Sequence, residues 1–587
     1  MRHVSQTRPG RSLSGRVRAL LGSACLLTAT VCIATAQAGT PAAGDAPSLA
    51  IHLAPQAGTP ASPGLQVRIV IDPGATALGP IGLPVSLGPL ANIADRVGDV
   101  RMRDAAGDVR LAVSDGPADG LLGSRQRLWT PQRPTRGPVT VDYVVAVSKE
   151  NVPGPIWDLR SEARGISGAG RTFLLLPQDT RDYRVGVDWN LAAYAQGAQA
   201  LDSLPASVRD GGQPLSLEAL RSTYLMAGNL HALPDDLGDA SGPFRAASTA
   251  QTPGYDQRDL LAWSEQAYRQ LSGFFREPTL PPFTTLFRTN PLTDKSGSAL
   301  PGALMSTMAV DLPREEIEQL LVHEMVHVYL DGLEEQSWFQ EGLAVVYEVR
   351  APFMLGLFSS DRYLAGINDT LRTYYSNVRK DMPIADAQAA FWTDARARMQ
   401  PYSRGGMYFL VTNARLLHAS GGKRSLDDVL RVFLDRRRAG EPVDADAWVA
   451  LLEREIGAQA RADFRALQDG GLLVPPEDAF GPCFRREQVP MPVFELGFEI
   501  ASLMQVPRVI RGLDPASPAA RAGLREGDRV GNAIGLDAQQ SDPGKPIVLK
   551  VERETGPVEI AFVPEGAPFP GYRWVRSDVA DGPACRY

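Results

Sequence analysis

The sequence predicts a multidomain α+β protein with a β-rich N-terminal part, a mainly helical middle part and a smaller C-terminal domain. Residues 39–240 alternate apolar and polar side chains between many Gly and Pro breaks, a pattern typical of antiparallel strands. From Asp256 to Phe480 the pattern becomes helical. A chain of 587 residues is long enough for about three or four domains.

The first 38 residues have the features of a secretory signal peptide. Five arginines and no acids come first, Ala19–Ala34 is apolar, and an A-x-A cleavage site ends at Ala38. The apolar run is short and is interrupted by Gly, Ser and Thr, so we favour cleavage over a membrane anchor or a lipoprotein formed through Cys25 or Cys32. We therefore expect an exported protein, periplasmic or secreted, with no membrane span after cleavage.

Cleavage would change the net charge from −7 to −12, because the five arginines leave with the signal. Such an acidic export product favours neither nucleic acid nor an anionic membrane as a partner. Cys483 and Cys585 would be the two cysteines left. One disulfide between them is plausible outside the cytosol. Neither cysteine has a Cys or His neighbour, so we expect neither a nucleophile nor a zinc ligand there.

The N-terminal part is predicted to be a β-sandwich, because its strand-like segments alternate cleanly. The clearest segments are Leu65–Ile71, Val139–Val145 and Tyr183–Trp189. The small, polar stretch Asp235–Gly254 is a natural boundary, and we place the end of the sandwich at residue 240.

The most informative motif is His323-Glu324-Met325-Val326-His327, an HExxH box. Two histidines four residues apart lie on one face of a helix, so both imidazoles can reach one metal ion. The glutamate between them points to a neighbouring side, where it can hold and deprotonate a water at the metal. The alternative is an ordinary helix with two satisfied histidines and a salt-bridged glutamate.

The residues around this box predict a buried helix. Asp311 can cap it, Pro313 suits its first turn, and Gly332 can end it. Residues 317–330 are apolar nearly all round, which indicates burial. Polar side chains inside such a helix are costly unless they have partners, and we expect a metal ion to be that partner.

A second helical segment supplies a third ligand by resemblance. Trp338–Glu348 resembles the gluzincin pattern W-[FL]-x-E-G-x-A-x-x-x-E, which follows HExxH in those zinc peptidases. The resemblance implies that Glu341 is the third zinc ligand; the alternative is an exposed helical acid. Here 13 residues separate His327 from Glu341, a shorter gap than in the aminopeptidase N type.

The same resemblance implies a mechanism. Zn²⁺ would acidify a water and polarise the scissile carbonyl. Glu324 would take the proton of that water and pass it to the leaving amine. Residues 401–405 are similar to the P-Y-x-K-G segment, whose tyrosine stabilises the transition state, so Tyr402 takes that role by resemblance and Arg404 replaces the lysine. The alternative for Tyr402 is packing at a helix start.

The C-terminal third of the sequence indicates which group of gluzincins the chain resembles. In Gly421–Arg431 the glycines are expected to end one helix, and Ser425 with Asp428 to cap the next. This stretch is similar to one in the glycyl-aminopeptidase family of gluzincins. Members of that family carry a C-terminal PDZ domain, and Val509–Val530 is a near-complete PDZ signature. Its carboxylate-binding loop would hold a C-terminal peptide through backbone amides. That loop is matched here by Leu496, Gly497 and Phe498. Alternatively, a degenerate PDZ domain merely packs on the catalytic domain.

The residue patterns and these resemblances together predict four segments: a signal peptide (1–38), a β-sandwich (39–240), a thermolysin-like zinc peptidase domain (241–480) and a PDZ domain (481–587). The expected function is exported, zinc-dependent hydrolysis of peptide or protein substrates. The alternative is a non-catalytic exported scaffold with a relic zinc fold and a peptide-binding PDZ module. The intact Glu324 favours the first, because a relic has no reason to keep the general base.

One position departs from the family. Gluzincin aminopeptidases grip the free amine of the substrate with a glutamate in a G-x-M-E-N or G-G-x-E-H strand. Gly302–Thr307 aligns with that strand and has Met305 where the acid should be. A thioether cannot pair with an ammonium, so the choice between aminopeptidase and endopeptidase stays open.

Overall fold

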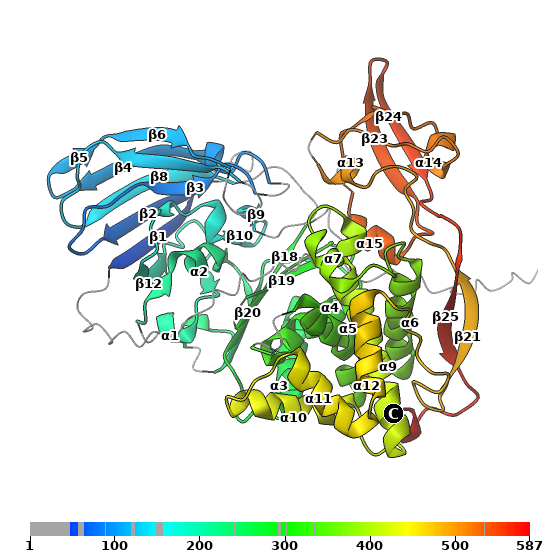
Figure 1. Ribbon diagram of the computed structural model, residues 1–587. Coiled ribbons are helices and arrows are strands. Elements are labelled where there is room, and N and C mark those ends of the chain that lie inside the picture. The colour runs from blue at the N-terminus through cyan, green and yellow to red at the C-terminus, as the bar shows by residue number, and fades with distance from the viewer. Residues whose placement is uncertain are drawn as a thin grey trace, which may run out of the picture.

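The computed structural model describes residues 47–586 except 57–63, 88–89, 119–123, 148–156, 210–211, 240–241, 291–294, 301, 331, 334–335, 506 and 533. The predicted signal peptide lies outside the described residues. Figure 1 shows the N-terminal sheets, a helical body and a C-terminal unit whose β-hairpin projects away from both. None of the helices in the described part of the chain has an apolar stretch long enough to cross a bilayer.

Three sheets make up the N-terminal part and share one hydrophobic core. The largest has seven strands, in the order β14 (Leu215–Ser216), β12 (Asp182–Trp189), β1 (Ser48–Gln56), β2 (Gly64–Asp72), β8 (Val139–Ala146), β4 (Val97–Asp104) and β5 (Gly107–Val109). A four-stranded sheet has the order β11 (Leu176–Pro177), β3 (Ile81–Pro84), β7 (Gln126–Pro131) and β6 (Leu111–Asp115). The third has the order β13 (Gln199–Asp202), β15 (Tyr224–Gly228), β10 (Gly165–Ala169) and β9 (Arg160–Glu162).

The alternating pattern produces this core as predicted. Along β1 and β2 the apolar side chains at every second position are buried, because successive side chains of a strand point to opposite faces. Most strand pairs are antiparallel, although β1 and β12 run parallel.

A five-stranded sheet joins the N-terminal part to the helices. Its order is β16 (His231–Leu233), β17 (Phe244–Ser248), β18 (Phe283–Thr289), β20 (Ala303–Met308) and β19 (Lys295–Leu300). The predicted boundary at residue 240 divides β16 from β17, which are paired antiparallel strands.

The helical body packs around one large core. Its main helices are α3 (Gln257–Phe274), α4 (Arg314–Leu330), α5 (Ser337–Met354), α6 (Ser360–Ser376), α9 (Gln400–Ser420), α10 (Leu426–Arg438), α11 (Ala445–Ile456) and α12 (Gln459–Asp469). The predicted helix around HExxH is α4, and its side chains are buried on nearly every face. The predicted cap is present too, since Ser425 and Asp428 form a capping box at the start of α10.

The C-terminal unit has a hydrophobic cluster of its own, built mainly from residues between Phe494 and Phe562. Its sheet has the order β22 (Arg529–Val530), β23 (Ile547–Arg553) and β24 (Gly556–Phe562). The strands β21 (Phe484–Met491) and β25 (Phe569–Arg576) pair with each other, and both contact α6 of the helical body. The predicted disulfide between Cys483 and Cys585 is present.

Candidate metal centre

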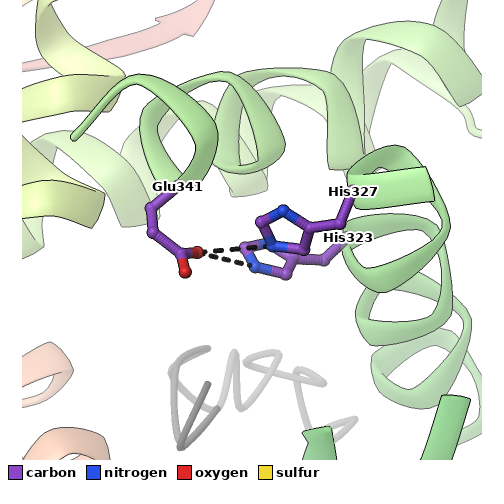
Figure 2. Close-up of side chains that lie close together, drawn as sticks. All are labelled: His323, His327 and Glu341. Carbon is purple, nitrogen blue, oxygen red and sulfur yellow. Dashed lines mark ion pairs between the residues drawn. The ribbon is translucent and has the colours of Figure 1, made fainter. Parts of the chain in front are cut away.

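Three side chains from α4 and α5 converge on one point. His323 and His327 come from successive turns of α4, and Glu341 comes from the second turn of α5 (Figure 2). Oε2 of Glu341 lies 3.4 Å from Nε2 of each histidine. Their candidate ligand atoms all lie within 4.8 Å of one another. The structure thus brings together the three residues that the sequence predicts as ligands.

The donor atoms fit a metal ion. Nε2 of His323, Nε2 of His327 and Oε2 of Glu341 are buried, and none has a hydrogen-bond partner among the described residues. Buried polar atoms without partners are costly, and a cation held between them would satisfy all three. Two imidazoles and one carboxylate make up the ligand set of a catalytic zinc site that keeps its fourth position open.

A second carboxylate, whose role the sequence analysis missed, orients His323. Glu348 lies seven residues after Glu341, two turns along α5, and its Oε2 is 2.7 Å from Nδ1 of His323. Gln319 donates to the other oxygen of Glu348 at 2.7 Å. With Nδ1–H donated to Glu348, Nε2 keeps its lone pair for a metal. The spacing of seven residues within the second helix was the signal that could have identified Glu348.

We expect Glu348→Ala to weaken zinc binding about 10- to 100-fold, the usual range for losing the carboxylate behind a metal-bound histidine. Glu348→Gln should weaken it less, since the amide oxygen can still accept the Nδ1–H bond. Zinc dissociation constants from competition with a chelator provide the measurement. Wild-type affinity in the Ala variant would rule out this role.

Glu324 lies beside the ligands and against the edge of the five-stranded sheet. It is fully buried, and neither carboxylate oxygen has a hydrogen-bond partner among the described residues. Burial raises the pKa of Glu324, while the charges of His323 and His327 oppose that shift. A Cβ at Gly297 of β19 would lie 2.5 Å from Oε1 of Glu324, so any larger residue there would displace the Glu324 side chain. The edge strand therefore passes directly over Glu324.

Tyr402 approaches from a third helix. It lies in the first turn of α9, is 3% exposed, and its ring stacks at 6.3 Å from that of His323. Two glycines allow this approach: a Cβ on Gly342 of α5 would lie 2.5 Å from the carbonyl carbon of Gly405. The backbones of α5 and α9 thus touch beside Glu341 and Tyr402, which fixes these two side chains relative to each other.

Arg404 has a structural role. Its guanidinium is buried and donates to the backbone carbonyls of Leu467 at 2.8 Å and Gly471 at 2.6 Å, and also to those of Lys380 and Ala466. The carbonyls of Ala466, Leu467 and Gly471 lie at and beyond the end of α12, where helices leave acceptors unsatisfied. Arg404 therefore ties the start of α9 to α12.

Met305 does not occupy the position that the sequence alignment gave it. It lies on β20, one strand in from the edge, and pairs with Ser298 of β19. Opposed residues share a face and neighbours along a strand alternate, so Met305 and Ser298 face away from Gly297 and Glu324. Met305 is buried in the N-terminal core instead. The strand that faces Glu324 is β19, not the Gly302–Thr307 segment that the sequence suggested.

The three residues of the predicted carboxylate-binding loop lie in the C-terminal unit, far along the chain from the metal centre. Leu496 and Phe498 are buried in the core of that unit. Gly497 has φ +77°, and a Cβ there would lie 2.2 Å from Cβ of Ser517. The chain then forms the short helix α13 (Ala501–Met504).

Comparison with known proteins supports the fold. No protein-family model matches the chain. The crystal structure of an aminopeptidase N family protein from Idiomarina loihiensis aligns with a TM-score of 0.61 at 14% identity, over 90% of this chain and 98% of that one. An M1 zinc metallopeptidase from Deinococcus radiodurans aligns with a TM-score of only 0.37 at 19% identity, over 73% of this chain and 95% of that one.

Sequence similarity is confined to a short stretch. The chain is 36% identical over 83 residues to Protease RseP from Yersinia pestis, which is 13% of this chain and 18% of that protein. It is 32% identical over 73 residues to the regulator of sigma-E protease RseP from Escherichia coli, 11% and 16% of the two chains. The chain thus spans less than a fifth of these relatives. The likeness over 90% of this chain shows that it has the fold of the Idiomarina loihiensis aminopeptidase N family protein.

Proposed function

We propose that this protein is a zinc-dependent metallopeptidase. The observation that carries the proposal is a set of buried ligand atoms on His323, His327 and Glu341 that have no hydrogen-bond partner among the described residues, beside a buried Glu324 carboxylate that has none either. These are five polar atoms: one nitrogen of each histidine, one oxygen of Glu341 and both carboxylate oxygens of Glu324. Burying them without hydrogen bonds would destabilise a helix that served packing alone. Export by the segment 1–38 remains part of the proposal, as does assignment of the C-terminal unit as a PDZ domain.

Different residues would carry out the separate steps of peptide-bond hydrolysis. Zinc held by His323, His327 and Glu341 supplies a Lewis acid that acidifies water and polarises a carbonyl. Glu324 holds the attacking water, accepts its proton on a carboxylate oxygen and delivers that proton to the nitrogen of the leaving amine. Burial of Glu324 keeps other waters from competing for that proton.

The edge strand provides a binding surface for an extended substrate. β19 is the last strand of its sheet, so its outer backbone groups have no strand partner within the described chain. A peptide can add to such an edge through main-chain hydrogen bonds, which leaves its sequence largely free. Because Gly297 brings β19 against Glu324, a peptide bound there would run past the base.

Tyr402 is placed to donate a hydrogen bond to the oxyanion. We expect Tyr402→Phe to lower kcat about 100-fold with little change in KM, because this donor acts when charge develops on the oxygen. Steady-state kinetics on one peptide will measure both parameters, with zinc content checked in parallel. An effect on KM alone would make Tyr402 a binding residue.

The substrate should be recognised without a strong anchor for its N-terminus. β19 contains no carboxylate, so the strand that faces Glu324 offers a free amine no charged partner. We expect matched peptides with free and acetylated N-termini to have kcat/KM values within about tenfold of each other. A preference for the free amine above roughly a hundredfold, nearly 3 kcal/mol, would show that another residue supplies an amine site.

The direct test of the proposed function pairs metal analysis with an unbiased peptide library. Purified protein should contain about one zinc per chain, and cleavage should stop with a chelator and return with zinc. Protein that binds zinc and cleaves no peptide in the library would contradict the proposal.

A further inference from the structure

The C-terminal unit touches the helical body next to the helix that carries Tyr402. Its helix α15 (Leu536–Ser541) packs against α8 (Ala395–Arg398) and α6. Arg398 forms a bidentate pair with Asp537, with Nη2 2.7 Å from Oδ1 and Nε 3.1 Å from Oδ2. Each of the two side chains is only 20% exposed. Arg372 of α6 donates to the carbonyl of Ser541 at 2.6 Å, so α15 is held from two sides.

The short helix α8 is also part of the core of the C-terminal unit. Ala395 is fully buried and belongs to the same hydrophobic cluster as Leu536. Its carbonyl accepts a buried hydrogen bond from Nε2 of Gln540 at 3.2 Å. A segment of the helical body is therefore fixed by contacts that the C-terminal unit supplies.

α8 continues almost directly into α9. Met399 ends α8 and precedes α9, and its carbonyl accepts from both the backbone N–H and the hydroxyl of Ser403, at 3.0 and 2.9 Å. Arg398 and Tyr402 are four residues apart, about one helical turn. A shift of α8 would therefore move the turn that presents the Tyr402 ring to His323.

We propose that Asp537 is a positioning residue for Tyr402, so that the C-terminal unit takes part in catalysis through the α15–α8 contact. This inference rests on the proposed peptidase function and on the role of Tyr402 within it. A donor to a developing oxyanion must be held within a fraction of an ångström, so loss of the contact lowers kcat and leaves KM unchanged.

The test uses the zinc-loaded full chain and compares Asp537→Asn, Arg398→Gln and the double variant. Each single variant should lower kcat about fivefold, which corresponds to the largest free energy usual for a partly exposed ion pair. The double variant should be no slower than either single variant, because both substitutions remove the same contact. In a Tyr402→Phe background, Asp537→Asn should cause no further loss. Hydrogen exchange of the peptide covering residues 395–403 should speed up in Asp537→Asn at unchanged zinc content.

The matched control is Arg553→Gln, which breaks a pair of similar burial inside the C-terminal unit, 2.6 Å from Asp528. It should leave both kcat and the exchange of residues 395–403 unchanged. An equal loss of kcat on adding Asp537→Asn to Tyr402→Phe, or unchanged exchange in that segment, would overturn the inference. A wild-type chain that cleaves no peptide would refute the proposed function instead, and the exchange measurement would still decide whether Asp537 holds α8.

Discussion

Replacing Glu324 with Gln is expected to lower kcat about 10²- to 10⁴-fold while the protein keeps its zinc. The amide has nearly the shape of the carboxylate but cannot accept the proton of the attacking water. None of the three candidate metal ligands is changed, so zinc binding should survive. The measurement is kcat on a library-derived peptide, together with the zinc content of the same sample.

Glu315→Gln is the control for that substitution, because Glu315 lies on the same helix with an exposed side chain. It removes one negative charge from α4 without touching the centre and should leave kcat within about twofold. Unchanged turnover in Glu324→Gln would refute the role of Glu324 as base, and loss of zinc would make it a ligand.

His323→Ala is expected to remove most of the bound zinc and, with it, the activity. The substitution deletes one of three ligands from the predicted zinc set. It also removes the partner of Glu348, whose Oε2 is 2.7 Å from Nδ1 of His323. The buried carboxylate would then lack a hydrogen-bond partner for that oxygen and would face the cavity left by the imidazole. We therefore expect a lower thermal midpoint as well, because breaking a buried charged pair from one side is destabilising.

His418→Ala is the matched control, since His418 also lies on a helix but its side chain is 77% exposed. Zinc per chain and the melting temperature should stay at their wild-type values in this variant. The double variant His323→Ala/His327→Ala provides the decisive case. If it still held nearly one zinc per chain, the assignment of these ligands would be wrong.

The two histidines of the metal centre could be predicted to lie together because their geometry is local. Two histidines four apart on a helix must lie on one face, whatever the rest of the fold does. Glu341 could be found only by its resemblance to a known pattern, since no local rule brings α5 against α4. The structure does bring them together, with Glu341 Oε2 3.4 Å from both imidazoles.

The strand that faces Glu324 could not be identified from the sequence. The strands β19 and β20 pair antiparallel, and both contain Ser, Ala and Leu. Such a pattern fixes neither which strand lies at the edge nor which face each residue takes. The pairing of Ser298 with Met305 and the contact of Gly297 with Glu324 decide it.

The sequence by itself determined the helix that carries the HExxH box, the closeness of His323 to His327 and the disulfide partners, because each depends on periodicity, on spacing within one helix or on having one candidate pair. Only the tertiary structure decided which strand passes over Glu324, that Glu348 orients His323, and that α15 reaches the helix of Tyr402. These contacts join residues that lie far apart in the sequence, such as Arg398 and Asp537. They arise from the packing of separate elements, which no local pattern of residues encodes.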